Sequence, residues 1–189
     1  MYLIRGQHNL KLFKSRYPNV LLSGTIGNFD GLHLGHQAIL EKIKNNAQKY
    51  SAKTIVFFTE PHAAEYFSKV RDENQIPPPR ICPWREKFQL LKKSEIDFAC
   101  FLKFNSKLRT MSPDDFISQI LDSINLVSFT VGDDFRFGAG RKGDTDLLKN
   151  WGEKKGILVE NTETITLDGQ RVSSTRIREE LLNNNFDNA

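Results

Sequence analysis

The sequence predicts an α/β protein with a largely parallel sheet and helices on both faces of that sheet. Short β-branched and aromatic runs alternate along the chain with amphipathic segments of helical periodicity, as parallel strands joined by crossover helices require. Polar, glycine- or proline-containing segments follow three of the predicted strands. Ligands of such sheets bind beyond the carboxyl ends of the strands, so we expect these three segments to face one crevice.

The first third of the chain alternates between strands and helices. Residues 20–26 form an apolar run that predicts a buried strand, and the amphipathic segment 38–50 predicts the helix after it. Residues 52–58 are β-branched and aromatic and predict a second strand. A proline- and arginine-rich connection, 75–83, then leads to a helix that we expect to begin at Trp84.

The middle of the chain adds two strands with a helix between them. Residues 96–104 and 126–132 are the third and fourth strand candidates. Residues 112–124, between them, carry apolar side chains on one helical face. Ser112 is a typical N-cap residue, and Pro113 suits the first position of a helix. This segment therefore predicts a helix.

The last third begins with a polar, glycine-rich segment, 133–144, directly after the fourth strand. Residues 145–155 predict a helix and 156–160 a fifth short strand. Residues 165–173 have an Asp-Gly pair between two short extended runs, which indicates a hairpin. A last helix is expected to begin near Ser174. We expect all 189 residues to form a single domain, because no repeat or low-complexity linker divides them.

Composition and charge exclude several classes of protein. The net charge is only +4, and basic residues alternate with acidic ones, so a small anionic ligand is expected rather than a nucleic acid. Cys82 and Cys100 lie far apart and lack the spacing of a zinc site, which favours a reduced, cytoplasmic setting. No apolar run is long enough for a signal peptide or a membrane span. We therefore expect a soluble protein without a membrane partner.

The segment GNFDGLHLGHQ, 27–37, places two histidines three residues apart at the start of a predicted helix. Gly31 and Gly35 allow a close approach of the backbone, and the free amides of a helix start attract anions. His33 and His36 can then donate hydrogen bonds to one phosphate group. A metal site would need a third ligand, and none lies nearby in the sequence. A helix cap without chemistry is the remaining alternative.

A second helix start, RVSSTRIREEL at 171–181, also suits a phosphate. Three hydroxyl side chains precede its first turn. Arg178 lies three residues after Thr175 and shares its face, whereas Arg176 points nearly the other way. Arg178 is therefore the arginine expected to reach the anion. The alternative is an ordinary capped surface helix whose arginines pair with neighbouring glutamates.

Two further segments follow strands. The loop VGDDFRFGAGRKGD is either a flexible surface loop or a loop that folds over an aromatic ligand. It contains Phe135 and Phe137, which are costly to leave in water, and this supports the second alternative at least as well as the first. The segment FFTEPHAAEYF places Pro61 and His62 just beyond the second strand. A lone histidine in this position is more often structural than functional.

Taken together, these segments resemble the FMN adenylyltransferase (FAD synthetase) module of the bacterial bifunctional riboflavin kinase/FMN adenylyltransferases. The HxGH and SSTxxR motifs are shared with the wider nucleotidyltransferase superfamily, whereas the VGDDFRFGAGRKGD loop indicates its flavin branch. The matching pieces span nearly the whole chain: LIRGQHNL, GTIGNFDGLHLGHQAIL, FFTEPH, PRICPWREKFQLL, FNSKLRTMSPDDFI, VGDDFRFGAGRKGD and RVSSTRIREEL.

The resemblance implies a Rossmann-like nucleotidyltransferase fold and the reaction of ATP with FMN to give FAD and pyrophosphate. Mg²⁺ is implied as a cofactor held mainly through the ATP phosphates, without metal ligands from the protein. The implied catalytic residues are His33, His36 and Arg178. The residues implied to bind ATP are Gly27, Phe29, Asp30, Gly31, Ser173, Ser174 and Thr175. The residues implied to bind FMN are Phe58, Pro61, His62, Asp134, Phe135 and Arg136.

The chain departs from the family pattern in three places. Ala63 stands where a second proline is common, and Cys82 stands where a threonine is usual; both lie on the implied flavin side. The sequence ends at NNNFDNA, where family members continue into a β-barrel riboflavin kinase domain. We therefore expect no kinase activity from this chain, whether it is a fragment or a naturally short protein. A riboflavin kinase domain or a separate kinase is a candidate partner.

Two other functions are compatible with the histidine motif. One is an adenylyl- or cytidylyltransferase for another phosphorylated acceptor, which would give no reason for the aromatic DFRFG loop. The other is a non-catalytic flavin- or nucleotide-binding remnant, against which the intact His33, His36 and Arg178 argue.

Overall fold

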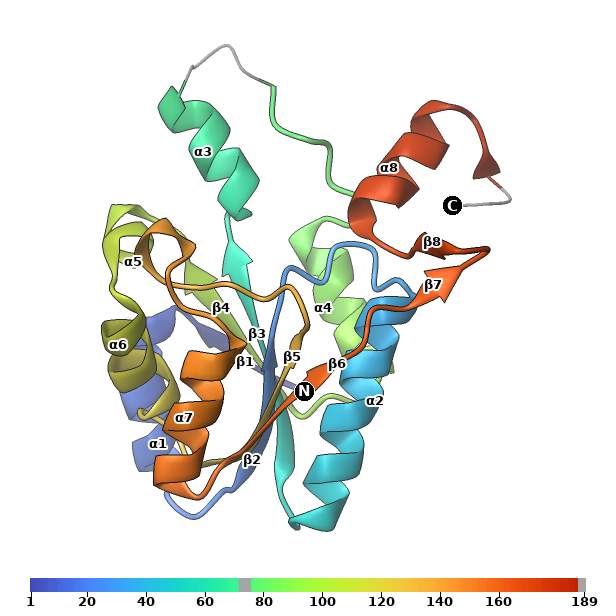
Figure 1. Ribbon diagram of the computed structural model, residues 1–189. Helices are drawn as coiled ribbons and strands as arrows, with labels where there is room; N and C mark the ends of the chain where they lie inside the picture. Colours follow the sequence, from blue (N-terminus) through green and yellow to red (C-terminus); the bar gives the residue numbers. More distant parts are fainter. Residues whose placement is uncertain (72–75, 187–189) are drawn as a thin grey trace.

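Six parallel strands form the central sheet in the part of the chain that the computed structural model describes, residues 1–71 and 76–186 (Figure 1). The order across the sheet is β1-β4-β3-β2-β5-β6. From β2 the chain moves through β3 and β4 in one direction and through β5 and β6 in the other. The strand order therefore reverses between β2 and β5, where such sheets bind ligands. The strands are β1 (Tyr2–Arg5), β2 (Leu22–Ile26), β3 (Lys53–Glu60), β4 (Phe98–Lys103), β5 (Leu126–Gly132) and β6 (Leu158–Thr162).

Helices cover both faces of the sheet: α1, α6 and α7 lie on one side, and α2 and α4 on the other. The predicted α/β class, the parallel sheet and its two helical layers are thus confirmed. No helix among the described residues is long and apolar enough to cross a bilayer. The helices are α1 (Leu10–Arg16), α2 (Leu34–Lys49), α3 (Ala63–Arg71), α4 (Trp84–Lys93), α5 (Ser106–Thr110), α6 (Pro113–Phe116), α7 (Thr145–Lys155) and α8 (Ser174–Leu182), with short turns η1 (Gln7–Asn9), η2 (Ile117–Leu121) and η3 (Ala139–Arg141).

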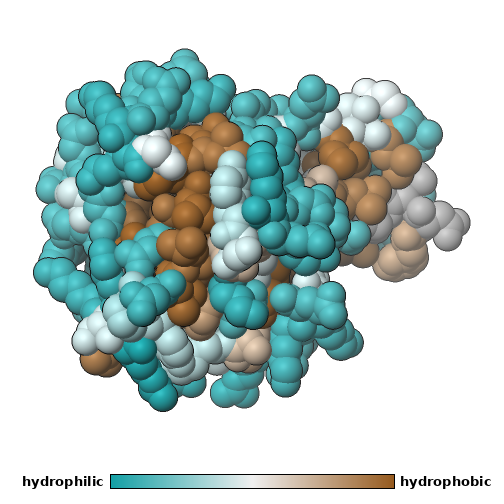
Figure 2. All heavy atoms as spheres, turned by 90° about the horizontal axis from the view of Figure 1, so that it is seen from below, coloured by the Kyte–Doolittle hydropathy of each residue, from teal (hydrophilic) through white to brown (hydrophobic). Residues whose placement is uncertain are grey.

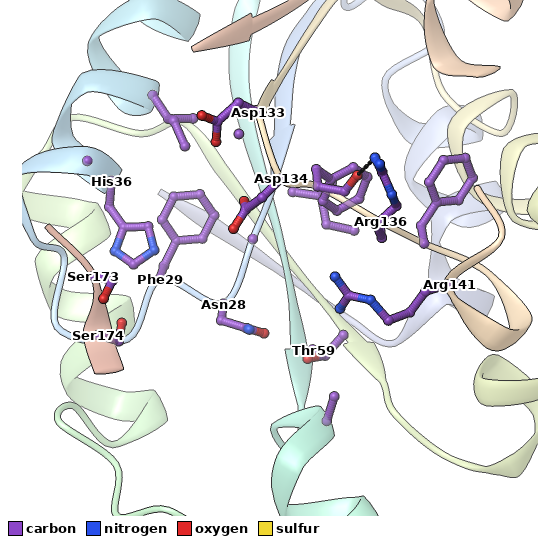
Figure 3. A pocket seen from close by; sticks show the side chains of 18 of the residues that line it. Asn28, Phe29, His36, Thr59, Asp133, Asp134, Arg136, Arg141, Ser173 and Ser174 are labelled. Carbon is purple, nitrogen blue, oxygen red and sulfur yellow. Dashed lines mark hydrogen bonds between the residues drawn. The ribbon is translucent and has the colours of Figure 1, made fainter. Parts of the chain in front are cut away.

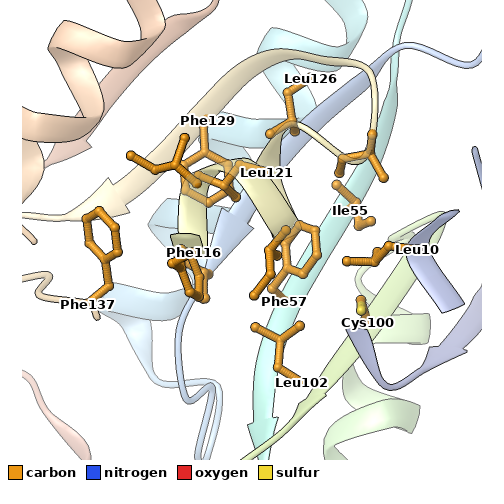
Figure 4. Packing of buried hydrophobic residues seen from close by; sticks show 14 of the residues in the cluster. Leu10, Ile55, Phe57, Cys100, Leu102, Phe116, Leu121, Leu126, Phe129 and Phe137 are labelled. Atoms are coloured by element: carbon orange, nitrogen blue, oxygen red, sulfur yellow. The ribbon is translucent and has the colours of Figure 1, made fainter. Parts of the chain in front are cut away.

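The core consists of one hydrophobic cluster on each face of the sheet. The larger cluster joins the sheet to α1, α6 and α7 and contains the fully buried Phe57 and Phe129 (Figure 4). The smaller joins it to α2 and α4 and contains Phe29 and Phe58. Because side chains on both faces are buried, the central strands show no alternation of buried and exposed residues. Their hydroxyl side chains are buried as well: Ser23, Thr25, Ser128 and Thr130. These two clusters hold the strand ends that form the site.

The structure adds one strand that the sequence pattern did not predict. β1 pairs with β4 at the edge of the sheet, and its four residues are too few for a periodic signal. The helix expected over 112–124 is shorter and changes type: α6 is followed by a π-helical segment that ends at Leu121. Its start is as predicted, because Ser112 Oγ accepts a hydrogen bond from the Asp115 amide at 3.0 Å. The predicted connection 75–83 begins outside the described residues.

The C-terminal part contains the predicted hairpin and the predicted helix. Strands β7 (Thr166–Leu167) and β8 (Gln170–Arg171) flank Asp168 and Gly169, both of which have positive φ as a tight hairpin turn requires. Helix α8 has no buried side chain and stands apart from the sheet in Figure 1. Figure 2 shows hydrophobic side chains along a hollow with hydrophilic margins, and in a second area on the side that carries α8. Contacts other than core packing must therefore hold α8 in place.

Candidate functional site

A cleft of about 1000 Å³ opens at the carboxyl ends of the strands. Its walls come from the turn after β2, the end of β3, the loops after β5 and β6, and the start of α8. The three segments expected to face one crevice therefore do so, and the second helix start joins them. In Figure 3, His36, Phe29 and Ser173 lie on one side of this cleft, and Arg136 and Arg141 lie on the other.

The turn between β2 and α2 brings the two histidines together. Phe29 has positive φ and no exposed surface, so its side chain anchors the turn in the core. His33 is the extended residue directly before α2. The rings of His33 and His36 stack with their centroids 3.7 Å apart, and both line the cleft. The Nδ1 atoms of both rings are buried and have no hydrogen-bond partner among the described residues.

Both histidines are neutral near pH 7. Burial, followed by the electrostatic influence of His33 and Lys87, lowers the pKa of His36 to about 3. Burial is also the largest reason why the pKa of His33 is lowered; Arg171 lowers it as well, whereas Asp30 raises it. A neutral imidazole still has one N–H donor. The pair can therefore donate hydrogen bonds to an anion without carrying a charge of its own.

The lowered pKa of His36 predicts a loss of stability in acid. The imidazole has a pKa of 6.5 in the unfolded chain and about 3 in the folded protein, so between these values the unfolded chain binds more protons. The free energy of unfolding should therefore fall as the pH drops below 6.5, by up to about 1.4 kcal/mol per pH unit from this group. Above pH 6.5 the group should contribute no pH dependence.

Urea unfolding of the wild type and of His36→Asn at pH 7.5 and pH 5.0 measures this effect. Between these pH values the wild type should lose about 1 to 2 kcal/mol more stability than the variant. Equal losses in both proteins would show that His36 does not titrate in this way.

The start of α8 presents hydroxyl groups and backbone amides to the cleft. Ser173 is the N-cap residue, and its Oγ accepts a hydrogen bond from the Arg176 amide at 3.2 Å. Ser173, Ser174 and Thr175 all line the cleft. Arg178 does not line it: its guanidinium donates to the carboxylate of Asp30 and to the Pro79 carbonyl. A guanidinium has five N–H donors, so these two contacts do not use all of the donors of Arg178.

The loop after β5 gives the cleft its aromatic half. The rings of Phe135 and Phe137 are nearly parallel, with centroids 5.7 Å apart, and both line the cleft with Arg136. Asp134 lines it as well and forms an ion pair with Arg171 at 2.6 Å. This pair links the loop to the hairpin that precedes α8. Further apolar lining residues are Phe67, Leu102, Phe104, Leu108 and Phe116.

Three residues of the FxPH-like segment lie outside the cleft walls. Phe58 has no exposed surface and packs in the smaller core cluster. Nδ1 of His62 accepts a hydrogen bond from the Ala64 amide at 3.1 Å, which caps α3. Burial is the main cause of the lowered pKa of His62. Ala63, rather than Pro61 or His62, lines the cleft, so the first of the three departures from the family pattern lies in its wall.

Some functional candidates were not singled out by the sequence. Asn28, Thr59, Arg109, Arg141 and Arg171 line the cleft beside the predicted residues, and Figure 3 shows Arg141 on the side opposite His36. For Arg141 the sequence offered one signal, the glycine-rich loop that contains it, because an arginine in a polar loop belongs to no periodic pattern. Their position in the wall of the cleft, known only from the fold, identifies them.

Comparison with known proteins gives the family. The family model for FAD synthetase matches residues 19–176, which include the turn after β2, the loop after β5 and the start of α8. The chain belongs to the FAD synthetase family.

Named relatives of this FAD synthetase-family chain are bifunctional enzymes. The bifunctional riboflavin kinase/FMN adenylyltransferase of Pseudomonas fluorescens is 38% identical over 188 residues, which cover 99% of this chain and 57% of the relative. The protein of the same name from Escherichia coli K12 is 37% identical over 187 residues, which cover 98% of this chain and 57% of the relative. The chain thus spans little more than half the length of these relatives.

A solved structure described as a macrolide-efflux protein from Streptococcus pneumoniae has the same fold. Its TM-score is 0.78 at 22% identity, and the match covers 97% of this chain and 58% of that one. At this level of identity the likeness supports the architecture alone.

Proposed function

We propose that the chain transfers the adenylyl group of ATP to FMN, giving FAD and pyrophosphate. One observation carries this proposal: a single cleft has two helix starts on one side and an aromatic wall on the other. Helix starts with free amides suit a triphosphate, and aromatic side chains suit a planar ring system. The cleft volume of about 1000 Å³ is at the upper end for ligand sites, which leaves room for two substrates. Membership of the FAD synthetase family supports the same reaction.

The proposed reaction needs no strong general base. The phosphate of FMN loses its second proton with a pKa near 6 by analogy with other phosphomonoesters, so an oxygen is available at pH 7 as the nucleophile. That oxygen attacks the α-phosphorus of ATP, the bond to the bridging oxygen breaks, and pyrophosphate leaves with the electron pair. The protein must align the two groups and stabilise the negative charge. Two neutral histidines suit the second task, since each has one N–H donor for a phosphate oxygen.

Within this proposal the two sides of the cleft have different tasks. His33 and His36 donate to phosphate oxygens of ATP, beside the amides at the start of α2. Ser174 and Thr175 hold the departing pyrophosphate, and Arg178 adds positive charge behind them. Phe135 and Arg136 contact FMN from the opposite wall. Gly27 and Phe29, which line the cleft on the histidine side, shape the ATP subsite.

Mg²⁺ enters the proposal only as an ion that ATP brings with it. Within residues 1–71 and 76–186 no group of three or more His, Cys, Asp or Glu side chains could hold a metal ion, so the described residues form no complete site of their own. Mg²⁺ retains water and is commonly held by substrate phosphates, whose charge it neutralises. No step of the proposed mechanism depends on a protein ligand to the metal.

The setting and the partner are also proposals. Cys82 and Cys100 are buried free thiols, which suits a cytoplasmic location. The names of the relatives include riboflavin kinase as well as FMN adenylyltransferase. We therefore propose that a riboflavin kinase, as a further domain or as a separate chain, supplies FMN to this site.

A product assay tests the proposed function directly. The purified protein is mixed with ATP, Mg²⁺ and FMN, and the flavin product is identified by chromatography; we expect FAD, with one pyrophosphate released per FAD. Riboflavin in place of FMN should give no FAD, since it lacks the attacking phosphate. Pyrophosphate release with nicotinate mononucleotide or pantetheine phosphate, but not with FMN, would contradict the proposal. So would binding of ATP and FMN without any product.

A further inference from the structure

Asp30 connects three segments that are distant in the sequence. Its carboxylate accepts hydrogen bonds from the backbone amides of Ile81 at 3.2 Å and Cys82 at 2.9 Å, and from the guanidinium of Arg178. Its backbone carbonyl accepts one from Ser174 Oγ at 2.8 Å. The residue is 3% exposed and does not line the cleft. Its oxygens therefore bind the protein itself rather than a ligand in the cleft.

Helix α8 depends on these contacts because it lacks core packing. None of its side chains is buried, whereas α2 buries Leu40 and Ile43. Hydrophobic burial thus fixes α2 but not α8. Two of the hydrogen bonds that reach the body of the protein from α8 end on Asp30, which belongs to the turn that starts α2.

We propose that Asp30 is a positioning residue that sets the start of α8 against the start of α2, and so determines the geometry of the triphosphate subsite. The inference rests on the proposed function, which places the phosphates of ATP between these two helix starts. A bond from a buried carboxylate to a charged guanidinium is stronger and more directional than a neutral one. The carboxylate holds α8 through Arg178, and the backbone carbonyl of the same residue holds Ser174. Asp30 therefore aligns the start of α8 with the His33–His36 pair.

A local role in the turn would not explain the pattern of contacts. An aspartate that only stabilises its own turn bonds to amides two or three residues away. The partners of the Asp30 carboxylate lie 51, 52 and 148 residues away. The contacts instead connect the turn to the segment around Ile81 and Cys82 and to α8, both of which are distant from it in the sequence.

Asp30→Asn tests the proposal, because it keeps the shape and one acceptor but removes the charge that pairs with Arg178. Calorimetric titration with ATP and Mg²⁺, without FMN, gives the dissociation constant of ATP. We expect it to rise about tenfold, the range for loss of one hydrogen bond to a charged group. The KM for ATP should rise by a similar factor, with a smaller change in kcat. Arg178→Gln combined with Asp30→Asn should weaken binding no more than the worse single change.

Asp97→Asn is the matched control. The Asp97 carboxylate also accepts hydrogen bonds from a backbone amide and a side chain, Thr54 N at 2.9 Å and Thr54 Oγ1 at 3.0 Å, and it pairs with Lys53. It precedes β4, at the end of the sheet away from the cleft. Asp97→Asn should leave the dissociation constant of ATP within about twofold of wild type, even if it lowers stability by as much as Asp30→Asn does.

The outcomes separate this inference from the proposed function. ATP binding by Asp30→Asn within twofold of wild type, or weakened equally by Asp97→Asn, overturns the positioning role even if the wild type makes FAD. Strictly multiplicative effects of the two changes overturn it as well. Weakened ATP binding together with no FAD from the wild type supports the inference and contradicts the proposed function. If Asp30→Asn does not fold, Asp30→Glu takes its place, since the longer side chain also displaces the contacts; unchanged ATP affinity in that variant contradicts the proposal.

Discussion

His36→Ala should reduce the turnover of FAD formation by about a hundredfold or more, which is the loss seen when other enzymes lose one preorganised hydrogen-bond donor. The imidazole lines the cleft, is largely buried and stacks on His33. A water molecule that replaced the imidazole would not be held in the position of the lost N–H donor. Because the donor acts on charge that develops in the transition state, kcat should fall more than the KM for ATP rises.

His8→Ala is the control for this prediction. His8 is exposed, belongs to η1 and lies outside the cleft, so its loss should leave kcat unchanged. Steady-state kinetics with varied ATP and fixed FMN measure both parameters, and circular dichroism checks that His36→Ala is folded. Near-normal FAD formation by folded His36→Ala would remove this residue from the catalytic assignment.

Phe57→Ala should destabilise the fold by about 3–5 kcal/mol, the range for deleting a buried aromatic ring. Phe57 has no exposed surface and lies on β3 in the middle of the larger core cluster, where Figure 4 shows it among Ile55, Leu102 and Phe116. The sheet and its helices surround it, so the cavity cannot close without moving a strand. A loss of this size is a large part of the stability of a single domain.

Urea unfolding followed by fluorescence measures the change, with Phe186→Ala as the control. Phe186 is 68% exposed, so its replacement should change the free energy of unfolding by less than about 0.5 kcal/mol. A loss below about 1 kcal/mol for Phe57→Ala would mean that the core collapses around the missing ring.

The sequence predicted the elements that have a clear hydrophobic pattern or typical turn and capping residues. The strands 20–26, 52–58 and 126–132 overlap β2, β3 and β5, because each is buried on both faces and reads as an apolar run. The turn at 168–169 followed from its Asp-Gly pair. β1 was missed because an edge strand of four residues has too few side chains to show a pattern.

The site was predictable as a set of segments but not as a set of contacts. The motifs correctly indicated that the histidines, the Phe135 loop and the serine-rich helix start belong to one crevice. They did not show that Phe58 is sealed in the core or that Arg178 is held by Asp30. Contacts between residues more than a hundred positions apart depend on how α8 packs over the turn after β2, and no local sequence pattern predicts that packing.

The reversal of strand order at β2 also constrains how the chain assembles during synthesis. One edge of β2 pairs with β3, whose register partners begin at Lys53, but the other edge pairs with β5, beginning at Leu126. Ribosomes deliver the chain from its N-terminus, so the second edge of this buried strand has no partner until more than a hundred further residues have been made. Until then the growing chain exposes an unpaired strand edge of the kind that chaperones protect.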